Sequence, residues 1–105
     1  MNAGMTLFRE VVGDNPRIRV LEFFLETREL DFGVGDVAEE TELSRQTAYT
    51  IIEEFYKKDL LIINRTLKNK QLYKLNLKSS VIQKWILLFD GIVFKDARIS
   101  KKLTA

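Results

Sequence analysis

The stretch from Leu60 to Leu77 constrains the fold of this chain most, because its side chains alternate between apolar and polar with a period of two. Such alternation predicts two β-strands that bury one face and expose the other. Residues 67–70 (Leu-Lys-Asn-Lys) lie between the two runs, so we expect a hairpin with its tip there. The apolar parity comprises Leu61, Ile63, Tyr73, Leu75 and Leu77.

The segments before and after this stretch have helical periodicity, so the predicted fold class is mainly α with a small β-hairpin. Asn15 and Pro16 are typical of an N-cap followed by the first helical position, and the helix they open runs to about Arg28. Two glycines in residues 30–35 break the pattern and suit a short strand or a turn. A short second helix is predicted over residues 36–41, with Asp36 as its cap.

A third helix is predicted from Arg45 to Lys58, with Ser44 as its cap and a tight turn at residues 42–43 before it. Its apolar residues recur at helical spacing and face the core: Ala48, Ile51, Ile52 and Phe55. The polar residues of its first turns therefore face outward, with Thr47 at the edge: Arg45, Gln46, Tyr49 and Thr50.

The final helix is predicted from a cap at Ser79–Ser80 to about Ala97, and it is apolar over more than half of its circumference. One domain of this size covers only one side of such a helix, so the other side needs a partner, most simply a second copy across a two-fold axis. Gly91 either bends or breaks the helix. The expected dimer residues are Trp85, Ile86, Phe89, Ile92 and Val93. Trp85 and Phe89 also suit a ligand pocket, although helix packing explains them more simply.

The 105 residues contain no cysteine and no histidine. These absences exclude disulfides, thiolate metal sites and the commonest general base, and nothing gathers carboxylates or a lysine into a pocket, so we expect no enzyme and no cofactor. The length predicts a single domain over 1–105, with a core at 13–78 and a dimerisation helix at 79–99. No signal peptide or membrane span is visible, which predicts a cytoplasmic protein without a membrane partner.

The net charge of +2 conceals an asymmetry between the two parts of the chain. Residues 1–42 carry four bases against ten acids, whereas residues 43–105 carry thirteen bases against five acids. Six bases and no acid lie between Leu60 and Phe89, which is typical of a polyanion binder. A solvated basic face is the alternative that charge alone leaves open.

Helix, short strand, helix, tight turn, helix and hairpin follow one another in the order of a winged helix-turn-helix, whose third helix fits the DNA major groove. Arg45 has the chemistry to contact guanine and Gln46 to contact adenine, while hydroxyls and the helix N-terminus suit phosphates. The basic hairpin suits the backbone or the minor groove. The candidate DNA-binding residues are Ser44, Arg45, Gln46, Thr47, Tyr49, Thr50, Arg65, Lys68 and Lys70.

Three segments carry a resemblance to a known family. Residues 13–24 (Gly-Asp-Asn-Pro-Arg-Ile-Arg-Val-Leu-Glu-Phe-Phe) resemble the opening helix of archaeal winged-helix transcriptional regulators of the MarR-like and ArsR-like class. Residues 37–49 resemble their helix-turn-helix, and residues 72–76 their second wing strand. The resemblance implies a dimeric DNA-binding regulator. Glu42 and Asp59 stand where such proteins usually carry glycine, and the Cys and His ligands of ArsR-type metal sensing are missing.

The sequence therefore predicts a homodimeric transcriptional regulator that binds a pseudo-palindromic DNA duplex. The alternative is a winged-helix adaptor whose basic face meets an acidic protein without binding DNA. A cation site is the weaker interpretation of the acids in and after the second helix, since acids in a first helical turn offset the helix dipole. Those acids are Asp36, Glu39, Glu40 and Glu42.

Overall fold

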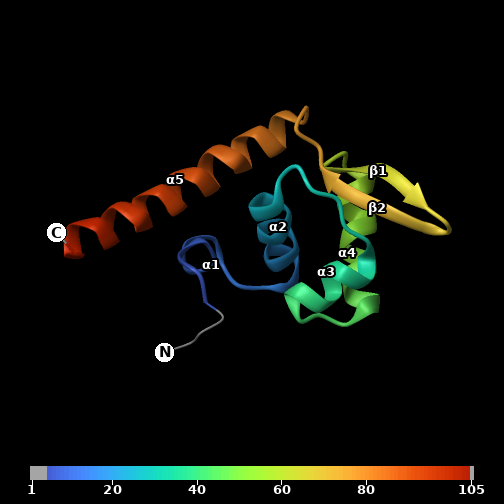
Figure 1. The fold of residues 1–105 in the computed structure, drawn as a ribbon, viewed down its shortest axis with the longest axis horizontal. Helices are drawn as coiled ribbons and strands as arrows, with labels where there is room; N and C mark the ends of the chain where they lie inside the picture. Colours follow the sequence, from blue (N-terminus) through green and yellow to red (C-terminus); the bar gives the residue numbers. More distant parts are fainter. Residues whose placement is uncertain (1–4, 105) are drawn as a thin grey trace.

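The computed structural model describes residues 5–104, with side-chain placement for residues 5–94 (Figure 1). Five helices surround a core that is closed on one side by a two-stranded antiparallel hairpin, which confirms the predicted fold class. The elements in chain order are α1 (Leu7–Val12), α2 (Pro16–Thr27), α3 (Val34–Thr41), α4 (Arg45–Lys57), β1 (Leu61–Leu67), β2 (Lys70–Leu75) and α5 (Ser80–Thr104).

Helix α2 lies at the centre of the fold and begins as the sequence predicts. Oδ1 of Asn15 accepts a hydrogen bond from the backbone N–H of Ile18 at 3.0 Å, and Pro16 occupies the first turn. The inward face of α2 packs against α3, α4 and α5. Its buried apolar side chains are Val20, Leu21, Phe24 and Leu25.

Helix α3 begins two residues earlier than predicted, and this corrects the role of Asp36. The N-cap is Gly33, and Asp36 lies in the first turn, where its carboxylate accepts a hydrogen bond from the N–H of Gly33 at 3.2 Å. From within the first turn, the carboxylate thus accepts a hydrogen bond from the backbone N–H of the N-cap residue. At the other end, Glu42 has a left-handed backbone (φ 58°) that turns the chain into α4.

The hairpin has its tip at Lys68 and Asn69, as the sequence predicts. Its alternation is interrupted by an irregularity between Ile63 and Arg65, after which Leu72 is buried beside Tyr73. Residues 30–35 form no complete strand. They contribute one backbone bridge, in which Phe32 and Tyr73 exchange hydrogen bonds of 2.9 and 2.8 Å.

Helix α5 is continuous through Gly91, so it neither breaks there nor ends near Ala97. Its N-terminus is capped by Oγ of Ser79, which accepts from the N–H of Ile82 at 3.2 Å. The sequence does not specify the structure of residues 1–12. Of these, residues 1–4 lie outside the described residues, and Leu7–Val12 form the short helix α1, which lies beside α5 (Figure 1). Within the described residues, no helix has the length and apolar character needed to cross a membrane.

Candidate nucleic-acid interface

The N-terminal half of α4 presents its polar residues outward, as the sequence predicts. Ala48 and Ile52 are fully buried, whereas Arg45, Gln46 and Thr50 are exposed and Tyr49 is 48% exposed. Ser44 acts as the cap: its Oγ accepts from the N–H of Thr47 at 3.1 Å. Thr47 is half-buried at the edge of this face. The first two turns of α4 therefore form an exposed surface of hydrogen-bonding side chains.

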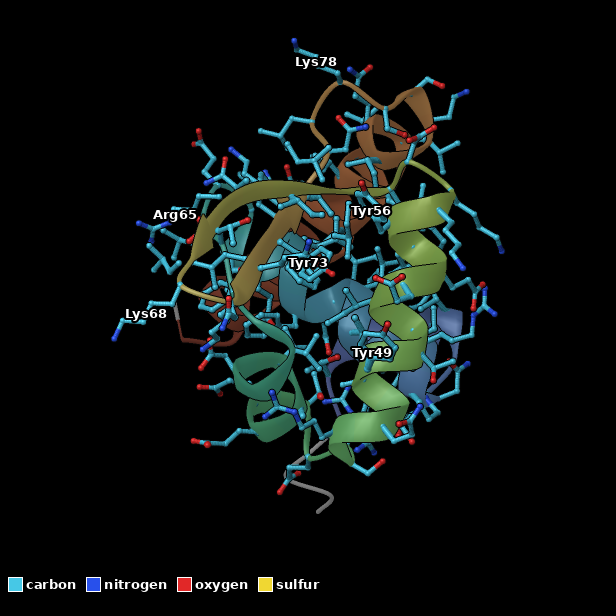
Figure 2. All side chains as sticks on the ribbon, turned by 90° about the vertical axis from the view of Figure 1, so that its right-hand side faces the viewer. Tyr49, Tyr56, Arg65, Lys68, Tyr73 and Lys78 are labelled. Carbon is cyan, nitrogen blue, oxygen red and sulfur yellow. The ribbon has the colours of Figure 1, made fainter. Side chains whose placement is uncertain are left out.

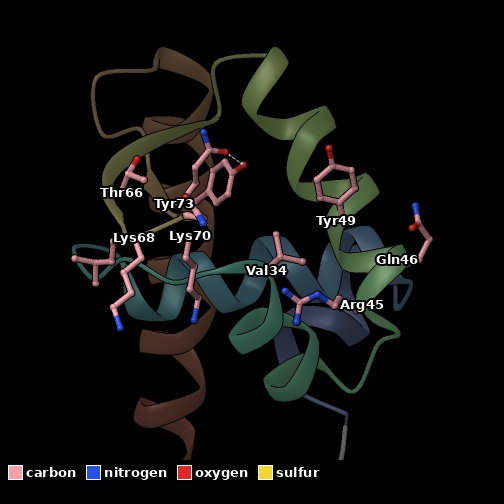
Figure 3. A pocket seen from close by; sticks show the side chains of 11 residues that line it. Val34, Arg45, Gln46, Tyr49, Thr66, Lys68, Lys70 and Tyr73 are labelled. Carbon is pink, nitrogen blue, oxygen red and sulfur yellow. Dashed lines mark hydrogen bonds between the residues drawn. The ribbon is translucent and has the colours of Figure 1, made fainter.

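An open groove of about 1160 Å³ separates this surface from the hairpin (Figure 3). Arg45, Gln46 and Tyr49 line one side, and the tip of the hairpin lines the other. Figure 2 shows Tyr49 on α4 and Tyr73 on the hairpin facing the same groove, with Lys68 reaching outward at the tip. The structure thus brings eight of the nine predicted DNA-binding residues to the groove or to the adjoining start of α4. Five line the groove (Arg45, Gln46, Tyr49, Lys68 and Lys70), and three lie at the start of α4 (Ser44, Thr47 and Thr50).

Arg45 provides an available cation at the start of α4. Among the described residues its guanidinium makes no ion pair or hydrogen bond, and it lies close to Gly35 in α3, where an added Cβ would come within 3.0 Å of its Nη1. Gln46 donates a hydrogen bond of 3.3 Å to Oγ1 of Thr50, one turn further along the helix. The planar fork of Arg45 is therefore available for a two-pronged contact from outside.

The three basic residues predicted for the hairpin have different surroundings. Lys68 is exposed at the tip, where its backbone is left-handed (φ 56°). Nζ of Lys70 lies 3.5 Å from Oδ2 of Asp36, a pair that is exposed on both sides. Arg65 lies away from the groove, where its Nε donates to Oδ2 of Asp31 at 2.8 Å. Only the two lysines thus present their charge beside the groove.

The ion pair of Arg65 and Asp31 shifts the pKa of both groups. The hydrogen bonds from Arg65 and from Asn64 hold the pKa of Asp31 below its usual value, and the carboxylate raises the pKa of Arg65. Both shifts stabilise the charged forms, so the pair persists through the neutral range.

Tyr73 connects the hairpin to α4, and the sequence identified it only as an apolar-face residue. Its ring is buried, with its edge against Tyr56, and its hydroxyl donates to Oε2 of Glu53 at 3.2 Å. The same hydroxyl lies 3.0 Å from Oε1 of Gln71. Burial, with the nearby charge of Glu53, raises the pKa of Tyr73 to about 12. The hydroxyl therefore stays protonated and links β2 to α4.

The predicted dimer residues on α5 are mostly engaged within the chain. Phe89 is only 8% exposed, because its ring packs edge-on against Phe8 of α1 at 5.3 Å. Trp85 packs against the same ring at 6.2 Å, while Ile86 and Ile92 are partly buried against the core. Helix α1 covers Phe89 within the chain, and the assignment of Phe89 to a subunit contact stays a prediction. Val93 is exposed, and so are four apolar residues of α5 outside the predicted dimer set: Val81, Leu87, Leu88 and Phe94.

Two of the four acids weighed as a cation site, one at each end of α3, have structural roles. Asp36 bonds to Gly33 and Lys70, and Glu42 forms the turn into α4. In residues 5–94, no three acidic side chains are grouped so that they would hold a metal ion.

Comparison with protein-family models and with curated proteins finds no match. Comparison with solved structures does. MepR, a transcription regulator of the Staphylococcus aureus multidrug efflux pump MepA, superposes with a TM-score of 0.61 at 11% identity, covering 93% of this chain and 70% of MepR. A MepR variant bound to an oligodeoxyribonucleotide has a TM-score of 0.60 at 11% identity, with 91% of this chain and 69% of MepR covered.

Two further solved structures extend the comparison. The homodimeric winged helix-turn-helix DNA-binding domain of Mb0332 from Mycobacterium bovis, a possible ArsR-family transcriptional regulator, has a TM-score of 0.58 at 13% identity. It covers 90% of this chain and 93% of that domain. The ferric uptake regulator of Francisella tularensis, solved with iron, has a TM-score of 0.58 at 15% identity. It covers 75% of this chain, which spans 59% of that protein. These structures show that the chain has the winged helix-turn-helix fold, with the hairpin as its wing.

Proposed function

We propose that the chain is a sequence-specific, double-stranded DNA-binding transcriptional regulator that acts as a homodimer. The observation that carries the proposal is the exposed polar face of α4 beside the groove and the wing lysines, with the guanidinium of Arg45 unpaired in the described structure. Neighbours with the same fold are transcription regulators, and one of them is solved with an oligodeoxyribonucleotide. The resemblance to the MarR-like and ArsR-like class supports the same proposal.

In the proposed complex, the first turns of α4 enter the major groove. Arg45 contacts O6 and N7 of a guanine, and Gln46 contacts an adjacent base edge after releasing Thr50. The wing lysines contact the phosphate backbone or the neighbouring minor groove. Ser44 and the N-terminus of α4 approach a phosphate, which the helix dipole favours.

The homodimer is proposed to form through the exposed apolar side of α5 that α1 does not cover. Leu87 is 73% exposed, and Leu88 and Val93 are also exposed on this helix. A second copy across a two-fold axis would bury these side chains and place two α4 helices on successive half-sites. The homodimeric state of the Mb0332 domain, which has the same fold, supports this arrangement.

The DNA proposal is tested by selecting bound duplexes from a random pool and then measuring affinity over a salt series. We expect Arg45→Ala to lower the specific affinity by about 1–3 kcal/mol and to relax base preference at one position per half-site. Lys68→Ala with Lys70→Ala should weaken binding to all duplexes and flatten the salt slope by about two units.

Lys78→Ala with Lys84→Ala is the matched control, since it removes the same charge outside the groove. If the control weakens binding as much as the wing variant, the assignment of the wing is wrong. If the wild-type chain retards no duplex at micromolar concentration, the protein-interaction adaptor replaces the proposal.

The dimer proposal is tested by sedimentation. We expect the wild-type chain to sediment as a dimer and Leu87→Asp to sediment as a monomer with unchanged helix content. Leu30→Asp is the control, because Leu30 is equally apolar and 60% exposed but lies outside α5. A Leu87→Asp variant that remains dimeric would exclude this side of α5 as the interface.

A further inference from the structure

Two glycines at the start of α3 lie directly beneath two cations that come from different elements. A methyl group added at Gly35 would approach Nη1 of Arg45 to 3.0 Å and its Cζ to 3.7 Å. A methyl group added at Gly33 would collide with Cε of Lys70 and come within 3.3 Å of its Nζ. One cation of the α4 surface and one cation of the wing therefore occupy the space that a side chain at Gly35 or Gly33 would need.

Backbone conformation does not explain why these two positions are glycine. Gly33 has φ −83° and ψ 167°, an extended conformation open to any residue, and Gly35 is inside a regular helix. Among the described glycines, only Gly13 has a positive φ. Glycine inside a helix is less stable than alanine, so Gly35 weakens α3. At Gly35, inside the helix, and at Gly33, the N-cap, a long side chain from another element takes the space that a Cβ would need.

We propose that Gly33 and Gly35 are positioning residues that seat Lys70 and Arg45 and so set where these cations stand in the groove. The proposal rests on the proposed function, in which both side chains contact DNA. Figure 3 shows Arg45 and Lys70 on either side of Val34 at the beginning of α3. The guanidinium of Arg45 makes no ion pair or hydrogen bond in residues 5–94 and lies so close to Gly35 that a Cβ there would come within 3.0 Å of its Nη1.

Displacing Arg45 and displacing Lys70 should affect DNA recognition differently. A two-pronged contact from Arg45 to guanine depends on the direction of a planar fork, so a displaced guanidinium loses base preference. Lys70 is a flexible point charge that serves a phosphate, so a displaced ammonium changes affinity for all sequences alike. In both cases the atom that a new methyl group meets is the end of a flexible side chain, so the fold accommodates the methyl group.

The experiment is a double-mutant cycle of Gly35→Ala with Arg45→Ala on the duplex selected by the wild-type chain. We expect Gly35→Ala to weaken binding about tenfold and to relax preference at the same base pair as Arg45→Ala. In the Arg45→Ala background, Gly35→Ala should change affinity by less than about twofold. The urea midpoint of Gly35→Ala should equal or exceed that of the wild type, which a merely structural role of Gly35 does not predict.

Gly33→Ala provides a second measurement, because it should weaken selected and unselected duplexes by the same factor and should do nothing further in the Lys70→Ala background. The position of the Arg45 guanidinium can also be monitored without DNA. The NMR chemical shift of the Arg45 Nε–H group should change in Gly35→Ala. An unmoved resonance, or equal losses in both Arg45 backgrounds, overturns the proposal. If the resonance moves but the chain binds no duplex, Gly35 still positions Arg45, and only the proposed function is rejected.

Discussion

Nε of Arg65 lies 2.8 Å from Oδ2 of Asp31, and this ion pair ties β1 of the wing to the segment between α2 and α3. Asn64 donates to the same oxygen at 2.8 Å. The side chain of Asp31 is 10% exposed, whereas that of Arg65 is 57% exposed. One of the wing cations visible in the sequence is therefore neutralised by the fold, and the wing offers less charge to a polyanion than its composition indicates.

Replacing Asp31 by Asn should release this cation. We expect Asp31→Asn to bind all duplexes more tightly than the wild type and to steepen the salt slope by about one unit, because one more cation meets the phosphates. Asp14→Asn is the control, since it removes one negative charge from a pair with Arg19, away from the wing. Equal gains in both variants would show that net charge, and not the freed Arg65, is responsible.

Acid should destabilise the fold partly through Asp31. Its pKa is below the ordinary value of 3.8 in the folded chain, mainly because Arg65 donates to it. The unfolded chain therefore binds a proton first as the pH falls, so the contribution of Asp31 is complete above about pH 4 and is lost below it. Urea midpoints measured between pH 7 and pH 2.5 should fall less steeply for Asp31→Asn than for the wild type. Parallel curves would contradict this.

The hydroxyl of Tyr73 should contribute to stability separately from its ring. Tyr73→Phe keeps the packing against Tyr56 but removes the hydrogen bond to Glu53, at a cost of about 1 kcal/mol in the free energy of unfolding. Tyr56→Phe serves as the control, because the Tyr56 ring is 39% exposed. Urea denaturation compares the two, and a larger loss in Tyr56→Phe would disprove this role of the Tyr73 hydroxyl.

Replacing Glu42 by glycine should stabilise the turn between α3 and α4. Glu42 has φ 58° and ψ 38°, where a Cβ atom is strained, so Glu42→Gly should raise the free energy of unfolding by about 1 kcal/mol. Asp59, with φ 60°, should gain less from the same change, since aspartate tolerates this conformation better. Thermal melts of the two variants and the wild type test this prediction. A melting temperature of Glu42→Gly below that of the wild type would contradict it.

The packing of helix α1 against α5 should depend mainly on the ring of Phe8. Phe8 is 2% exposed and touches both Trp85 and Phe89, so Phe8→Ala should lower the free energy of unfolding by about 3–5 kcal/mol. Val11→Ala, an exposed position on the same helix, should change it by less than about 0.5 kcal/mol. The fluorescence of Trp85 monitors the urea unfolding of both variants. Similar urea midpoints for Phe8→Ala and Val11→Ala would mean that α1 does not pack as described.

Much of the fold and of the α4 surface could be predicted because the responsible signals are local. The spacing of Ala48, Ile52 and Phe55 determines which side of α4 is inward, and the exposed polar face follows from it. Side-chain alternation predicts the hairpin until the irregularity after Ile63, where one extra residue on β1 shifts the register so that Arg65 pairs with Leu72. A register shift leaves no periodic mark in a sequence, so the sequence could not show it.

The sequence by itself determined the order of the elements, the caps at Asn15 and Ser44, and the outward face of α4, because each depends on residues within a few positions. The tertiary structure alone decided which charges and apolar faces remain available. Asp31 meets Arg65 across 34 positions, and Phe8 covers Phe89 across a far longer interval of the chain. Pairs this distant in sequence meet only when the whole chain packs, so only the packed chain shows what is left exposed to bind.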